Sequence, residues 1–247
     1  MNPGKIVVLL AALALTACAT TAPPPEERDP RDPWEPYNRN MYAFNRGLDK
    51  AIVRPIARGY TAIMPDPIET GLTNVFENLL GLQKMINLTL QGRPADTVQM
   101  AARFTMNTIF GLAGFFDVAS KTGLPEYDED FGQTLAVWGW EDSRYFVLPL
   151  LGPSTVRDGL GEFPDSYSNI VWRRAVSGRP YLLAVDIIQT RANFLPREAQ
   201  LEEAFDEYLF VRDAWLQRRD FKIKGESTTP DYDSFLDDED WDEDADG

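Results

Sequence analysis

Apolar residues recur at intervals of three and four along most of the chain between residues 34 and 224. That spacing places apolar side chains on one face of a helix, whereas strict alternation would indicate a strand. The clearest repeats cover residues 41–52, 68–80 and 201–216. Prolines divide this body into segments of helical length, because proline interrupts a helix interior. The pattern predicts an all-α fold, mainly helical with long irregular loops.

Local signals refine this prediction at two places. Asp66-Pro67 predicts a helix start, with a capping carboxylate and a proline at the first helical position. Alternating patterns are scarce, and Tyr145 to Leu148 is the best candidate for a short strand.

A charge-free segment, residues 104–116, departs from ordinary amphipathicity. As one helix it would extend about 20 Å, which is enough to cross one leaflet but not a bilayer. A buried central helix of a soluble domain is the alternative. We expect Asn107 and Thr108 to face protein or an aqueous channel, and Gly111 and Gly114 to let another backbone approach closely. The predicted channel residues in this segment are Phe104, Asn107, Phe110, Gly111, Gly114, Phe115 and Phe116.

Residues 1–17 have the anatomy of a signal peptide, with one lysine followed by ten apolar residues. They end at Leu15-Thr16-Ala17-Cys18, which resembles a bacterial lipobox. The resemblance implies that Cys18 is the lipid attachment site, and Ala19 favours the outer membrane. A plain secretory signal is the alternative. Two or more acyl chains would anchor the chain stably.

Charge is concentrated at one end of the chain. The net charge is −15, but residues 231–247 alone hold ten carboxylates and no base. We therefore interpret residues 225–247 as an acidic disordered tail and the proline-rich residues 18–33 as a tether between lipid and fold. No basic stripe is present to neutralise phosphates, which argues against a nucleic-acid partner.

The chain contains no histidine and one cysteine. These absences exclude Ser-His-Asp and Cys-His nucleophiles and a histidine-ligated zinc site. We predict no catalytic residues, no cofactor and no metal. The alternative of a calcium site at Glu126, Asp128, Glu129 and Asp130 is weaker than a solvated loop, because the spacing is not that of an EF-hand.

An ordered series of short motifs runs from residue 32 to residue 222. It includes Asp32-Pro33-Trp34-Glu35-Pro36-Tyr37-Asn38-Arg39, Phe44-Asn45, Arg54-Pro55-Ile56-Ala57, Leu90-Gln91-Gly92, Glu129-Asp130-Phe131-Gly132-Gln133-Thr134, Gly152-Pro153-Ser154 and Leu216-Gln217-Arg218-Arg219. In this order the motifs resemble the VacJ/MlaA lipoproteins of Gram-negative bacteria. Ser143-Arg144 departs from the family pattern, which often has glycine and proline there.

The resemblance implies a ring-like, membrane-embedded helical domain over residues 34–224, in the inner leaflet of the outer membrane. Such a protein removes mislocalised phospholipid from the outer leaflet through an amphipathic channel. Its implied partners are a trimeric porin and a periplasmic lipid-carrier protein. By the same resemblance, Phe44 and Asn45 would form a gate together with the charge-free segment.

Two other function classes remain as alternatives. A structural or adaptor lipoprotein bound to porins would show no lipid movement through the purified protein. A phospholipase or esterase would need a serine arrangement without histidine, and Gly152-Pro153-Ser154 lacks the Gly-x-Ser-x-Gly pattern of a nucleophile elbow.

Overall fold

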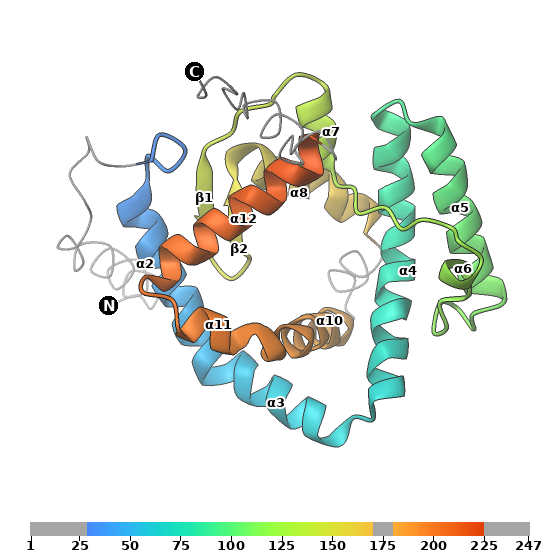
Figure 1. The fold of residues 1–247 in the computed structure, drawn as a ribbon, viewed down its shortest axis with the longest axis horizontal. Helices are drawn as coiled ribbons and strands as arrows, with labels where there is room; N and C mark the ends of the chain where they lie inside the picture. Colours follow the sequence, from blue (N-terminus) through green and yellow to red (C-terminus); the bar gives the residue numbers. More distant parts are fainter. Residues whose placement is uncertain (1–28, 170–179, 225–247) are drawn as a thin grey trace, which may run out of the picture.

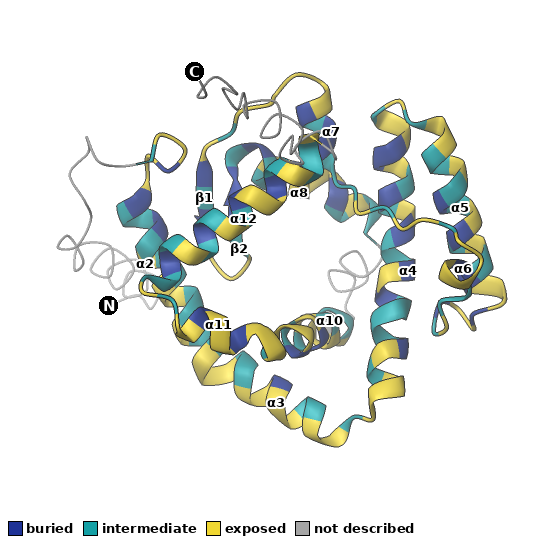
Figure 2. Ribbon diagram, viewed as in Figure 1, coloured by how far each residue is buried: buried dark blue, intermediate teal, exposed yellow. Residues whose placement is uncertain are grey.

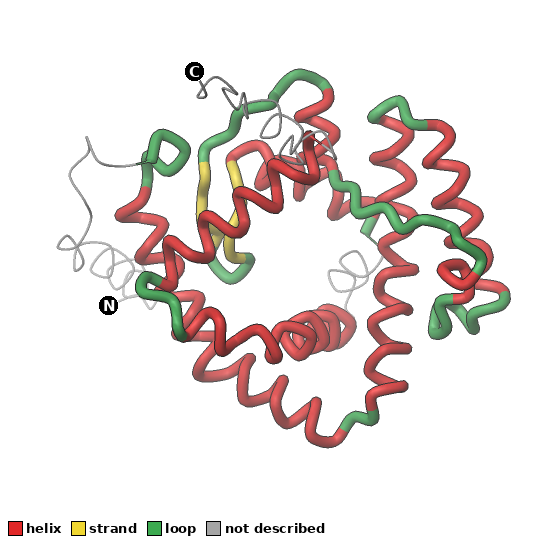
Figure 3. Tube along the Cα trace, in the orientation of Figure 1, coloured by secondary structure: helices red, strands yellow, loops and turns green. Residues whose placement is uncertain are grey.

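The computed structural model describes residues 29–169 and 180–224. Over these residues the chain is mainly helical, with one pair of short strands, so the predicted all-α class is confirmed (Figures 1 and 3). The elements are α2 (Glu35–Leu48), the π-helix η2 (Asp49–Val53), α3 (Arg54–Ile63), α4 (Asp66–Leu90), α5 (Pro94–Ile109), α6 (Val118–Lys121), α7 (Phe131–Val137), β1 (Tyr145–Leu148), β2 (Gly152–Thr155), α8 (Val156–Ser168), α10 (Pro180–Phe194), the 3₁₀-helix η3 (Leu195–Arg197), α11 (Glu198–Glu202) and α12 (Glu207–Lys224).

The helices follow one another around a ring (Figure 1). α2 and α3 form one side and α4 the opposite side, while α7, α8 and α12 complete the circuit. α10 packs against both α3 and α4, and α5 and α6 lie outside α4 as a second layer. The ring-like arrangement implied by the family resemblance is therefore present.

A single helical rod carries the chain along one side of this ring. α2 runs through η2 into α3 without a break. Within η2 the Arg54 N–H donates to the Asp49 carbonyl, one residue further back than in an α-helix. The next residue is Pro55, which has no N–H to donate, and a local change of helical pitch accommodates it.

The predicted start of α4 is correct in position but not in detail. The helix begins at Asp66, and Pro65 occupies the cap position. No side-chain capping hydrogen bond is formed there, so Asp66 is a first-turn residue rather than a cap. Its carboxylate still suits the positive end of the helix dipole.

The two strands form an antiparallel hairpin in which Tyr145 pairs with Thr155 and Leu148 with Gly152. The predicted strand at Tyr145 to Leu148 is confirmed. Its partner, residues 152–155, has no apolar alternation that would have signalled it. The hairpin packs on α12, where Tyr145, Val147, Tyr208 and Leu216 form a small apolar core.

Across residues 29–169 and 180–224, no helix combines the length and apolar character needed to cross a membrane. The signal peptide (residues 1–17), Cys18, most of the tether and the acidic tail (residues 225–247) lie outside the described residues.

Candidate functional site

The charge-free segment is a helix end followed by a tight turn. α5 ends at Ile109, and the chain then reverses over residues 110–116. Residues 112–114 have φ values of 52°, 59° and 96°, which stop an α-helix. The Gly114 N–H donates to the Asn107 carbonyl (2.8 Å), closing the helix end. The expectation of one continuous helix is therefore wrong for residues 110–116.

Glycines let this turn pack directly on α4. A Cβ at Gly114 would lie 2.6 Å from the Cβ of Asn78, and the Phe115 ring occupies the space of a Cβ at Gly71. Close backbone approach at Gly114 is thus confirmed. Gly111 differs, because a Cβ there would meet a carbonyl oxygen of its own turn rather than another helix.

A buried polar cluster holds the base of the turn. The Asn107 side-chain amide donates to Asp117 (3.0 Å) and accepts from the Ala119 N–H (2.9 Å). The Arg103 guanidinium pairs with the second Asp117 oxygen at 2.7 Å. Burial acts to raise the pKa of Asp117, but hydrogen bonds from Ser120 and Asn107 and the Arg103 charge lower it below its usual value. The carboxylate therefore stays ionised and keeps its partners.

Two asparagines of α4 complete the support of the turn. Asn78 donates to the Thr108 hydroxyl (3.0 Å), and Asn74 donates to the Phe115 carbonyl (3.2 Å). Asn107 and Thr108 both bond to protein groups, which is one of the two settings expected for them. Asn74 and Asn78 are supporting residues that the sequence analysis did not identify. Their spacing of four on a helix is the signal that places both on one face.

The aromatic residues of the segment divide between interior and surface. Phe104 is partly buried against Gly81 of α4. Phe110 and Phe116 are 69% and 51% exposed. A rigid turn therefore presents large apolar side chains outward.

Asn45 fixes a different feature, the tip of the β-hairpin. Its amide donates to the Leu148 carbonyl (2.9 Å), and its oxygen accepts from the Leu150 N–H (2.8 Å). Leu150 has a φ of 67° and, with Leu151, is largely exposed. Neighbouring Phe44 is half exposed. Figure 1 places α2 and the charge-free segment on opposite sides of the ring, so these regions do not meet in one gate.

We expect Asn45→Ala to destabilise the hairpin tip by about 2 kcal/mol, because two backbone groups lose their partner. Chemical unfolding of the detergent-solubilised protein measures this cost. Asn40→Ala, an exposed position on the same helix, serves as the control. Equal effects of the two substitutions would show that Asn45 does not hold the tip.

Burial among the described residues is inverted relative to a water-soluble protein, and Figure 2 shows exposed positions along α3, α4 and α10. Among the described residues, 18 polar or charged side chains are buried against 12 hydrophobic ones, and 29 large hydrophobic side chains are exposed. Single exposed apolar residues are ordinary, but contiguous patches mark contact with a membrane or another protein. Exposed large apolar residues occur on α3, α4, α5, α8 and α10, so several helices of the ring offer apolar side chains for such contact.

Ion pairs within the fold join the ring at η2. Arg191 of α10 pairs with Asp49 (2.6 Å) and with Glu198 of α11 (2.9 Å). Arg46 of α2 pairs with Glu198 (3.3 Å) and with Glu207 of α12 (3.1 Å). Arg191 therefore ties α10 to η2 and α11.

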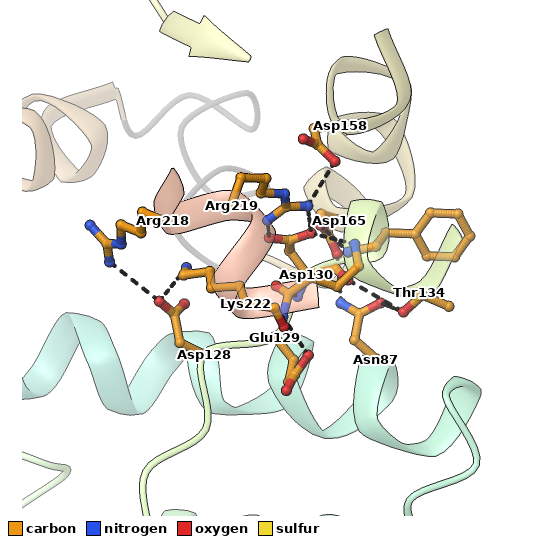
Figure 4. Close-up of polar contacts among 12 residues, drawn as sticks. Asn87, Asp128, Glu129, Asp130, Thr134, Asp158, Asp165, Arg218, Arg219 and Lys222 are labelled. Atoms are coloured by element: carbon orange, nitrogen blue, oxygen red, sulfur yellow. Dashed lines mark hydrogen bonds and ion pairs between the residues drawn. The ribbon is translucent and has the colours of Figure 1, made fainter. Parts of the chain in front are cut away.

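A pocket of about 390 Å³ lies between α8, α12 and the loop before α7, and we call it the charged pocket. Eight of its eleven lining residues are charged. Figure 4 shows Arg219 of α12 between Asp130 and Asp158, with N–O distances of 2.7 Å from Nη2 to each carboxylate. Nearby, Asp165 accepts from Asn87 (2.9 Å) and from the Phe131 N–H (2.8 Å).

The acidic loop considered for calcium divides among several cations. Glu126 lies near Lys84 and Arg103, Asp128 pairs with Lys222 and Arg218, Glu129 with Arg93, and Asp130 with Arg219. No group of three or more carboxylates in the described part of the chain is placed to hold a metal ion. These carboxylates are accounted for by ion pairs.

Comparison with known proteins identifies relatives over most of the chain. The family model for the MlaA lipoprotein matches residues 30–222. The Intermembrane phospholipid transport system lipoprotein MlaA of Haemophilus influenzae is 32% identical, over 94% of this chain and 95% of the relative. The protein of that name from Escherichia coli K12 is 35% identical, over 90% and 89%. A solved structure described as "Structural basis for maintenance of bacterial outer membrane lipid asymmetry" has a TM-score of 0.69 and 33% identity, covering 79% of this chain and 100% of its own.

Proposed function

The chain belongs to the MlaA lipoprotein family, and from this premise we propose that it transports phospholipid away from the outer leaflet of the outer membrane and so maintains lipid asymmetry. The observation that carries the proposal is the inverted burial. Large apolar side chains are exposed on the helices of the ring, while more polar than apolar side chains are buried among the described residues. Such a surface matches the acyl region of a leaflet.

Polar groups on the inner elements support a path for headgroups. A second pocket, of about 320 Å³, lies between α4 and α10, and all six of its lining residues are polar. Thr73, Asn74 and Asn193 line it, and Asn193 donates to Thr73. Both helices border the middle of the ring in Figure 1. A phospholipid needs wet polar contacts for its headgroup and apolar contacts for its tails, and this chain offers both.

The lipid anchor at Cys18 would hold the ring in the periplasmic leaflet of the outer membrane. A trimeric porin beside the ring and a periplasmic lipid carrier below it would complete the route. Transport requires no covalent chemistry, and we assign no catalytic residue. An adaptor role at porins without lipid transfer remains the second candidate. It predicts no lipid movement when the purified protein is placed in bilayers.

Deletion of the gene is expected to expose phospholipid on the cell surface, and the wild-type gene should reverse this. Cys18→Ser should abolish acyl labelling and fail to restore asymmetry, because the chain loses its anchor. Thr20→Ser, two residues beyond the lipobox, is the control and should restore it. Outer-leaflet phospholipid is the quantity to measure. Full labelling and full restoration by Cys18→Ser would contradict the proposal.

A further inference from the structure

One wall of the charged pocket carries more carboxylates than cations, and it runs from buried Asp165 to exposed Glu162. Asp130, Asp158, Glu162 and Asp165 line it together with one guanidinium, Arg219. Asp165 and Arg219 are each 7% exposed, and two buried atoms, Asp158 Oδ2 and Arg219 Nε, have no hydrogen-bond partner. Arg219 pairs with Asp130 and Asp158, and Arg157 also pairs with Asp158, whereas burial and the neighbouring carboxylates raise the pKa of Glu162. The wall is therefore suited to a cation.

At the mouth of the same pocket, cations outnumber carboxylates. Arg218 and Lys222, one turn apart on α12, both pair with a single carboxylate, Asp128 (Figure 4). The Arg218 side chain is 74% exposed, and its donors reach solvent. Two cations against one carboxylate leave a surplus positive charge, which is suited to a phosphate.

A ligand that fits both the acidic wall and the basic mouth must carry a positive and a negative charge. A metal ion needs several oxygen ligands converging on one point, and no described group of three or more carboxylates provides that. A primary ammonium carries a single charge and three N–H donors, so one or two neighbouring carboxylates can hold it without a full shell of oxygen ligands. Charged walls exclude acyl chains, so only a headgroup would enter the pocket.

We propose that the charged pocket binds the headgroup of phosphatidylethanolamine, with its phosphate at Arg218 and Lys222 and its ammonium toward Asp158 and Glu162. This inference rests on the proposed function and adds a headgroup preference to it. Phosphatidylglycerol has the phosphate but lacks the ammonium, so it would satisfy only the mouth of the pocket.

The test measures binding of short-chain lipids to the purified full chain in detergent by calorimetry. Dihexanoyl phosphatidylethanolamine should bind about tenfold more tightly than dihexanoyl phosphatidylglycerol, a difference of about 1.4 kcal/mol. Glu162→Gln should remove this preference and leave phosphatidylglycerol binding unchanged. Arg218→Gln should weaken both lipids about threefold. The matched controls Glu203→Gln and Arg197→Gln, at exposed positions outside the pocket, should change neither.

Equal affinity of the wild-type chain for the two lipids would overturn the inference. Glu162→Gln leaving the preference intact would also do so, provided that its circular dichroism and melting temperature match those of Glu203→Gln. If Glu162→Gln does not fold, the Arg218→Gln variant decides the question. Equal lipid affinities of Arg218→Gln and Arg197→Gln would then overturn the inference. Free phosphoethanolamine binding as tightly as the lipid would assign the pocket to a soluble ligand and overturn the lipid assignment. If headgroup binding fails in one of these ways but outer-membrane asymmetry is normal, the proposed function still stands. If the wild-type gene does not restore asymmetry in the deletion strain, the proposed function is wrong.

Discussion

Gly114→Asp is expected to abolish phospholipid transport and to leave little folded protein. Gly114 has a φ of 96°, and a Cβ there would lie 2.6 Å from the Cβ of Asn78. The side chain would push the turn off α4 and bury a carboxylate against it, at a cost above about 4 kcal/mol. Protein level and outer-leaflet phospholipid in a complemented deletion strain measure the effect.

Gly123→Asp is a matched control for this substitution. Gly123 has a φ of 78°, but nothing lies within 4 Å of a Cβ placed there. The Gly123 variant therefore has the backbone strain without the collision, and the strain costs about 1–2 kcal/mol. Similar losses in the two variants would show that packing of the turn on α4 is not what Gly114 protects.

Arg219→Gln is expected to destabilise the fold by about 3–5 kcal/mol, the usual cost of breaking a buried ion pair. The guanidinium bridges Asp130 and Asp158, so its loss leaves Asp130 without its cation and Asp158 with Arg157 alone. Chemical unfolding at neutral pH measures the difference. Arg218→Gln, at a 74% exposed side chain on the same helix, should cost less than about 0.5 kcal/mol. Equal costs would mean that the bridge does not stabilise the native state.

The effect of Arg219→Gln should also depend on pH. Burial acts to raise the pKa of Asp158, but the Arg219 charge and hydrogen bonds from Arg157 and Arg219 hold it below the ordinary value of 3.8. A lowered pKa in the folded state stabilises the protein above the unfolded value, and this stabilisation is lost as the pH falls through the folded pKa. The stability gap between wild type and variant should therefore narrow below about pH 4.

Much of the fold was predictable because it depends on local signals. Proline positions and apolar spacing located the helices, and the alternation at Tyr145 to Leu148 located β1. The turn at residues 110–116 was not predictable from the same signals. A charge-free run has the same composition in a helix as in an apolar turn. The structural role of Gly111 and Gly114 depends on the residues that pack beside them, which the local sequence does not specify.

The candidate site was predictable only where a motif carried it. The family resemblance pointed to Asn45, but its role at the hairpin tip depends on a contact with Leu148, 103 residues away. The charged pocket was missed because its residues come from separate parts of the sequence. Asp130, Asp158 and Arg219 meet only when α7, α8 and α12 pack together.

Inverted burial also affects the heat capacity of unfolding. Exposing apolar surface to water raises the heat capacity, while exposing polar surface lowers it. Because many large apolar side chains of the described residues lie at the surface and many polar ones are buried, unfolding of this chain changes heat capacity less than for a water-soluble protein of equal length. A smaller heat-capacity change flattens the curve of unfolding free energy against temperature, so we expect the stability of this chain to vary less with temperature.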